Sequence, residues 1–87
     1  MKMMIVIVKD SDSESLTRAL IGAQYRVTAI SSTGGFMRSG VATLLIGLED
    51  SQIDAASELV RATLKAADPG EKRATLFVVP VSRFEQV

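Results

Sequence analysis

The sequence contains neither cysteine nor histidine. Without cysteine, the chain can form no disulfide and no thiolate metal site, and it offers no thiol nucleophile. Without histidine, it lacks the commonest general base and metal ligand at neutral pH. Both absences disfavour hydrolytic, acyl-transfer and zinc chemistry. We therefore expect a protein that is not an enzyme, with no catalytic residue, no metal site and no cofactor.

A charge excess and long hydrophobic runs are absent as well. Ten Lys and Arg residues balance ten Asp and Glu residues, so we expect no long-range positive field and no binding of a nucleic-acid polymer. The N-terminal apolar run at residues 3–8 is too short for a signal-peptide core or a membrane span. These features predict a cytoplasmic protein without a membrane span.

Hydrophobic patterning predicts six elements in one domain, 1–87. They are a strand at 3–8, a helix at 13–23, strands at 25–32 and 41–48, a helix that opens at Ser51 and ends at 68–70, and a strand at 74–80. Asp12 or Ser13 can cap the first helix, and Ser51 with Asp54 forms an aspartate version of a capping box at the second. The order βαββαβ predicts an α+β, ferredoxin-like fold, with a four-stranded antiparallel sheet and two helices on one face.

The first strand is apolar on both of its faces, because Met3, Ile5 and Ile7 alternate with three further apolar residues. Two helices cover only one face of a sheet, and a domain of this size buries only about 60% of the surface of its unfolded chain. A soluble monomer rarely leaves a large apolar face in water, so we expect the second face to pack against other subunits. The alternative is cover by the loops and the tail 81–87, which is short for that purpose.

The stretch at residues 33–40 has the composition of an anion-binding loop. It reads Thr33, Gly34, Gly35, Phe36, Met37, Arg38, Ser39 and Gly40. The three glycines can turn successive N–H groups towards one point, and the two hydroxyls add donors. Arg38 suits a phosphate, and the ring of Phe36 offers a face for a base. The alternative is a hairpin loop whose glycines only satisfy turn geometry.

Three residues outside this loop are further binding candidates. Arg26 and Thr28 share one face of the second strand, together with Gln24 if the strand starts that early. They either read the base or phosphate of a ligand or are ordinary polar residues of an edge strand. Gly47 lies inside a strand, where glycine is unfavourable unless a ligand approaches the backbone or a bulge is needed.

The run 33–40, preceded by Arg26-x-Thr28 and followed by the strand 74–81 and by Phe84-Glu85-Gln86, resembles the cyclic-di-AMP receptor family of PII-like proteins. The resemblance extends over essentially the whole chain. It implies a PII-like homotrimer that binds its ligand in three clefts between subunits, has no enzymatic activity and signals to a downstream protein partner, whose identity is unknown.

The resemblance also implies roles for individual residues. Arg26 and Thr28 would contact the ligand, Gly47 would admit it, and Gln24 stands where the family tends to have a shorter amide. With the loop, the predicted ligand-binding set is Gln24, Arg26, Thr28, Thr33, Gly34, Gly35, Phe36, Met37, Arg38, Gly47, Phe77 and Gln86. Two features depart from the family. Val41 replaces an asparagine that reads the adenine, and residues 68–73 replace a longer, glycine-rich excursion.

The sequence therefore predicts a PII-like sensor for cyclic-di-AMP or a related adenine nucleotide. A protein-interaction module of the same fold, trimeric and independent of any ligand, is the alternative.

Overall fold

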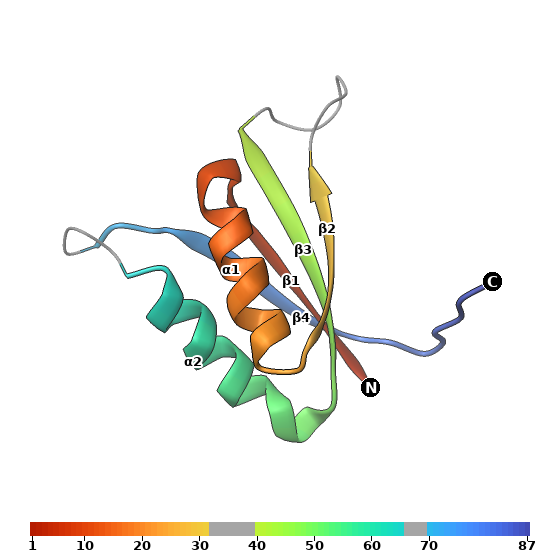
Figure 1. The fold of residues 1–87 in the computed structure, drawn as a ribbon. Coiled ribbons are helices and arrows are strands. Elements are labelled where there is room, and N and C mark those ends of the chain that lie inside the picture. The colour runs from red at the N-terminus through yellow and green to blue at the C-terminus, as the bar shows by residue number, and fades with distance from the viewer. Residues whose placement is uncertain (32–39, 66–69) are drawn as a thin grey trace.

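The computed structural model describes residues 1–31, 40–65 and 70–87. The elements are β1 (Lys2–Lys9), α1 (Asp10–Gly22), β2 (Arg26–Ser31), β3 (Val41–Leu48), the 3-10 turn η1 (Asp50–Gln52), α2 (Ile53–Thr63) and β4 (Ala74–Pro80). The strands form one antiparallel sheet in the order β2-β3-β1-β4. Both helices lie on the same face of this sheet (Figure 1). This arrangement confirms the predicted ferredoxin-like fold.

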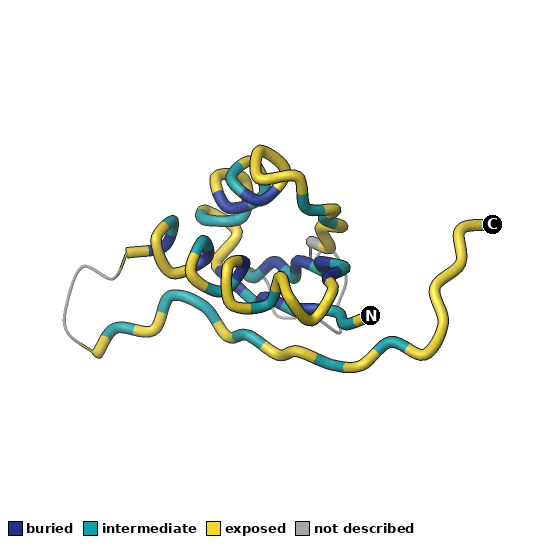
Figure 2. Tube along the Cα trace, turned by 90° about the horizontal axis from the view of Figure 1, so that it is seen from below, coloured by how far each residue is buried: buried dark blue, intermediate teal, exposed yellow. Residues whose placement is uncertain are grey.

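The core lies between the helices and the two central strands. Buried and partly buried residues alternate along β3, as the period of two along a strand requires. The buried apolar residues are Met4, Val6, Val8, Leu16, Leu20, Ala42, Leu44, Ile46, Leu48, Ala56, Val60 and Leu64. Figure 2 shows this buried layer beneath the helices, whereas the edge strand β4 is only partly buried or exposed along its length.

The first helix begins three residues earlier than the sequence predicts. The Asp10 N–H donates to the Gly40 carbonyl at 2.9 Å, which secures the first residue of α1 through a distant part of the chain. Lys9 is the N-cap and makes no side-chain cap bond. The prediction that Asp12 or Ser13 caps α1 is therefore wrong. Both lie inside the first turn, where the Ser13 hydroxyl donates to the Asp10 carbonyl at 3.0 Å.

The capping box before the second helix involves a different pair from the predicted one. The Glu49 N–H donates to Gln52 Oε1 at 2.8 Å, and the Glu49 side chain accepts from the Gln52 backbone. Ser51 and Asp54 take no part in this box, because η1 begins before α2 and moves the cap to Glu49. At its other end α2 stops at Thr63, ahead of the predicted end at 68–70.

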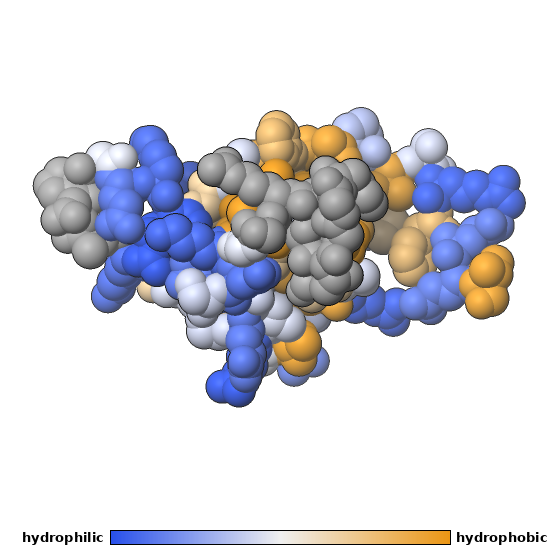
Figure 3. Space-filling model, turned by 90° about the horizontal axis from the view of Figure 1, so that it is seen from above, coloured by the Kyte–Doolittle hydropathy of each residue, from blue (hydrophilic) through white to orange (hydrophobic). Residues whose placement is uncertain are grey.

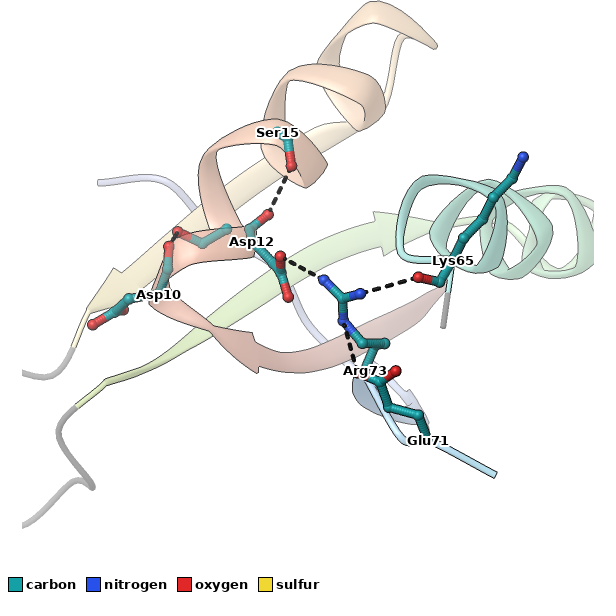
Figure 4. Close-up of polar contacts among 7 residues, drawn as sticks. Asp10, Asp12, Ser15, Lys65, Glu71 and Arg73 are labelled. Atoms are coloured by element: carbon teal, nitrogen blue, oxygen red, sulfur yellow. Dashed lines mark hydrogen bonds and ion pairs between the residues drawn. The ribbon is translucent and has the colours of Figure 1, made fainter. Parts of the chain in front are cut away.

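Arg73, the residue before β4, connects the start of this strand to α1 and to the segment that follows α2 (Figure 4). Its Nη2 donates to Asp12 Oδ1 at 3.0 Å, and its Nη1 donates to the Lys65 carbonyl at 3.0 Å. Glu71 Oε1 lies 3.8 Å from Nε. The Asp12 and Arg73 side chains are only 15% and 26% exposed. Sequence reasoning missed this cluster, because 61 positions separate Asp12 from Arg73 and no local pattern connects them.

Candidate functional site

The sheet face opposite the helices is apolar and open. The strand register arranges its side chains in rows that cross β2, β3, β1 and β4 in that order. The rows are Arg26–Gly47–Met3–Val79, Thr28–Leu45–Ile5–Phe77 and Ile30–Thr43–Ile7–Thr75. Figure 3, which views the molecule from above, shows hydrophobic side chains gathered in the middle of the molecule, with hydrophilic ones on either side. Phe77 in the second row is 51% exposed, so the single chain leaves a large apolar side chain in contact with solvent.

A groove of about 740 Å³ lies at the end of the sheet where β1 begins and β3 ends. The start of β2 contributes Arg26 and Thr28 to its lining, and the end of β3 contributes Gly47. The C-terminal tail 81–87 contributes Gln86. The fold thus brings four of the predicted ligand-binding residues to one cavity. We call it the Arg26 groove.

Arg26 and Thr28 owe their place in the groove to the alternation of side chains along β2. Val27 and Ala29 pair with Ile46 and Leu44, which belong to the buried face, so Arg26 and Thr28 are on the open one. Arg26 is exposed, and its guanidinium has no hydrogen bond or ion pair within the described residues. A free guanidinium beside a hydroxyl is suited to binding an anionic oxygen.

Gly47 lies in an uninterrupted part of the sheet. It pairs with Met3 on one side and with Arg26 on the other, within a register that runs without a break from Val41 to Leu48. A bulge therefore does not explain this glycine. A Cβ at this position would meet only the Met1 Cε within 4 Å, at 3.3 Å. The missing side chain keeps the floor of the Arg26 groove low, which permits a close approach to the backbone.

The sequence of this chain matches a known protein family over most of its length. The family model described as cyclic-di-AMP receptor matches residues 1–69. The chain belongs to the cyclic-di-AMP receptor family. The resemblance noted from the sequence is thereby confirmed. In this receptor family member the match includes β1 to α2 and ends before β4. The tail residues that line the Arg26 groove therefore lie outside the matched range.

One solved structure has an architecture similar to that of this receptor chain. It is described as a functionally unknown protein from Pediococcus pentosaceus, and it superposes with a TM-score of 0.76 at 32% sequence identity. The match covers 99% of this chain and 96% of the other. The two chains are therefore nearly equal in length.

Some predicted residues of this cyclic-di-AMP receptor family member are not in the groove. Gln24 lies in the turn after α1 with a positive φ of 73°, and β2 begins only at Arg26, so the early strand start is wrong. Phe77 is one row away from the Gly47 row and does not line the groove. The predicted residues from Thr33 to Arg38 lie outside the described residues.

Sequence reasoning also missed residues that line the groove of this receptor chain. Lys2, Gln52 and Arg83 belong to the lining, yet no motif singled them out. The only signal was their charge or amide group, which many surface residues share. Among the described residues that line the groove, Glu49 is the only carboxylate, and its side chain already accepts a backbone hydrogen bond in the capping box. Cations therefore outnumber carboxylates, which favours an anionic ligand.

Within residues 1–31, 40–65 and 70–87, no cluster of three or more carboxylates is placed to hold a metal ion. Over the same ranges, neither helix is long and apolar enough to cross a membrane.

Proposed function

We propose that this protein is a PII-like sensor that binds cyclic-di-AMP, or a related adenine nucleotide, in clefts between the subunits of a homotrimer. The observation that carries the proposal is the Arg26 groove, which unites Arg26, Thr28, Gly47 and Gln86 in a member of the cyclic-di-AMP receptor family. The protein acts by binding and carries out no reaction, and it works in the cytoplasm on a downstream protein partner.

Each groove residue has a chemical role in this proposal. Arg26 pairs with a phosphate, and the Thr28 hydroxyl donates a second hydrogen bond to it. Gly47 lets the ligand approach the sheet, and the Gln86 amide both donates to and accepts from a base edge. The loop 33–38 supplies the remaining contacts, with backbone N–H groups for phosphate and Phe36 for stacking.

The open sheet face supports the trimeric part of the proposal. Three rows of mainly apolar side chains lie on it, and Phe77 is half exposed in the single chain. Head-to-tail burial of such a face between identical subunits gives a closed ring when the rotation between them closes. The Arg26 groove begins at one corner of this face, because Arg26, Gly47 and Met3 form its first row. Assembly would therefore bring a neighbouring subunit close to the groove.

Calorimetric titration of the full chain, with its mass determined by light scattering, tests this proposal. We expect cyclic-di-AMP to bind near one per subunit, and to bind more tightly than cyclic-di-GMP, ATP or AMP. Arg26→Ala should weaken binding about tenfold or more, since it removes a charge-assisted hydrogen bond. Arg18→Ala is the matched control, because Arg18 pairs with Glu14 on the surface of α1 and is not part of the groove. Equal affinity of the Arg26→Ala variant and the natural chain would contradict the proposed site.

A ligand-independent trimeric interaction module is the second candidate. The family match ends at residue 69, and Val41, which can neither donate nor accept a hydrogen bond, is partly buried on the open face. A ligand that binds only the folded state must raise its melting temperature by mass action. A trimer whose melting temperature stays constant with every nucleotide of the panel would favour this second candidate.

A further inference from the structure

Arg83 lines the same groove as Arg26, and the family resemblance gives it no role. We propose that Arg83 is a second phosphate-binding residue, so that the Arg26 groove selects ligands with two anionic groups over ligands with one. The inference rests on the proposed function and deepens it, because it names the feature of the ligand that this chain selects.

The position of Arg83 follows from the way in which β4 ends. The Val81 N–H donates to the Met1 carbonyl at 3.1 Å, which extends the pairing of β4 with β1 by one residue beyond Pro80. The first residue of the tail, Val81, is thereby held beside Met1, the residue before β1. Arg83 follows two residues later, within about 7 Å of extended chain. Figure 1 shows the tail passing the N-terminus at this end of the sheet.

Arg26 lies on one edge strand, β2, and Arg83 lies in the tail that follows the other edge strand, β4. The first row runs from Arg26 on β2 across Gly47 and Met3 to Val79 on β4. Three strand spacings of about 4.8 Å place the two edges about 14 Å apart. Gly47 and Met3 form the floor between them. A ligand with one anionic group can engage one guanidinium, whereas a ligand with two can engage both.

The present partner of Arg83 is an exchangeable one. Arg83 Nη2 lies 2.6 Å from Glu85 Oε1, and the two side chains are 79% and 56% exposed. Exposed ion pairs contribute little to stability, because water screens them. Glu85 does not line the groove. A phosphate bound in the groove would therefore compete with the Glu85 carboxylate for the Arg83 guanidinium. Lys2, a third cation of the groove lining, is already 3.9 Å from Asp50 Oδ1.

Two substitutions with opposite effects test the inference. Arg83→Ala should weaken cyclic-di-AMP binding about tenfold, in line with the loss of one charge-assisted hydrogen bond, and should leave AMP binding within twofold. Glu85→Gln removes the competitor while keeping the shape of the side chain, so cyclic-di-AMP binding should tighten about two- to fivefold. Arg18→Ala and Glu14→Gln are the matched controls, because they break a similar exposed pair on α1.

The measurement is calorimetric titration of each full-length variant, after its melting temperature has been compared with that of the natural chain. If Arg83→Ala binds cyclic-di-AMP like the natural chain while Arg26→Ala does not, the inference is overturned and the proposed function stands. Equal loss of AMP and cyclic-di-AMP binding would also overturn it, since selection between one and two anionic groups would then be absent. If the natural chain binds neither nucleotide, the proposed function and the inference both fail.

Discussion

Gly47 links stability and binding at the scale of one residue. Its substitution by alanine places a Cβ 3.3 Å from the Met1 Cε, and this flexible end of a side chain can shift. We therefore expect Gly47→Ala to leave the free energy of unfolding unchanged or to raise it by up to about 1 kcal/mol, since alanine loses less chain entropy on folding. Cyclic-di-AMP binding should weaken, because the added methyl raises the floor of the Arg26 groove. Urea denaturation and titration measure the two effects separately, and unchanged affinity would show that the ligand does not approach this strand.

Val41 is the second residue whose side chain we expect to affect nucleotide binding. The register pairs it with Lys9 on the open face, at the opposite end of β3 from Gly47. By resemblance, the family has an asparagine here that reads the adenine. Val41→Asn should therefore tighten the binding of cyclic-di-AMP more than that of cyclic-di-GMP. Val41→Thr, which keeps the β-branched shape and adds only a hydroxyl, is the control. A gain that is equal for both dinucleotides would count against base reading by residue 41.

At the scale of elements, Arg73 connects the start of β4 to α1 and to the segment that follows α2. Removing one partner of a largely buried ion pair leaves the other carboxylate or guanidinium uncompensated. We expect Arg73→Ala to lower the free energy of unfolding by about 1 to 3 kcal/mol, below the range for fully buried pairs because Arg73 is partly exposed. Arg61→Ala breaks an exposed pair with Glu58 and should cost less than about 0.5 kcal/mol. Equal midpoints of urea unfolding for the two variants would contradict the role given to Arg73.

The elements also show where local patterns are reliable. β3 runs from Val41 to Leu48 as the sequence predicts, because eight mostly apolar residues between two glycine- or charge-containing segments form a strong local signal. The start of α1 differs from the prediction, because residues 10–13 are all polar residues that could cap a helix and no local pattern excludes an earlier start. The hydrogen bond from the Asp10 N–H to the Gly40 carbonyl, thirty positions away, secures the start at Asp10, and Lys9 becomes the N-cap.

Assembly is the property of the whole molecule that most needs a test. Phe77→Glu should convert the proposed trimer to a monomer, because the exposed edge-strand side chain tolerates a charge in the single chain but not in an interface between subunits. Ala62→Glu, at an exposed position on α2, is the control and should leave the mass unchanged. Light scattering gives the mass, and circular dichroism verifies the fold. A Phe77→Glu chain that keeps the mass of the natural assembly would contradict the proposed interface.

The sequence by itself determined the order and type of the six main elements, the antiparallel fold and the family. It could do so because hydrophobic period, glycine and turn residues act over a few positions, and because the motif at 33–40 is contiguous. It also placed Arg26 and Thr28 on one face, since alternation along a strand is a local property.

Only the tertiary structure decided which distant residues meet. The strand order β2-β3-β1-β4 brings Met3, Arg26 and Gly47 into one row, and the hydrogen bond from Val81 to Met1 brings the tail to the same groove. The place of Arg83 in the groove and the ion pair of Asp12 with Arg73 are therefore apparent only from the tertiary structure. Their contacts depend on strand register and on the meeting of segments that are distant in the sequence. No pattern within a short stretch of sequence encodes either one.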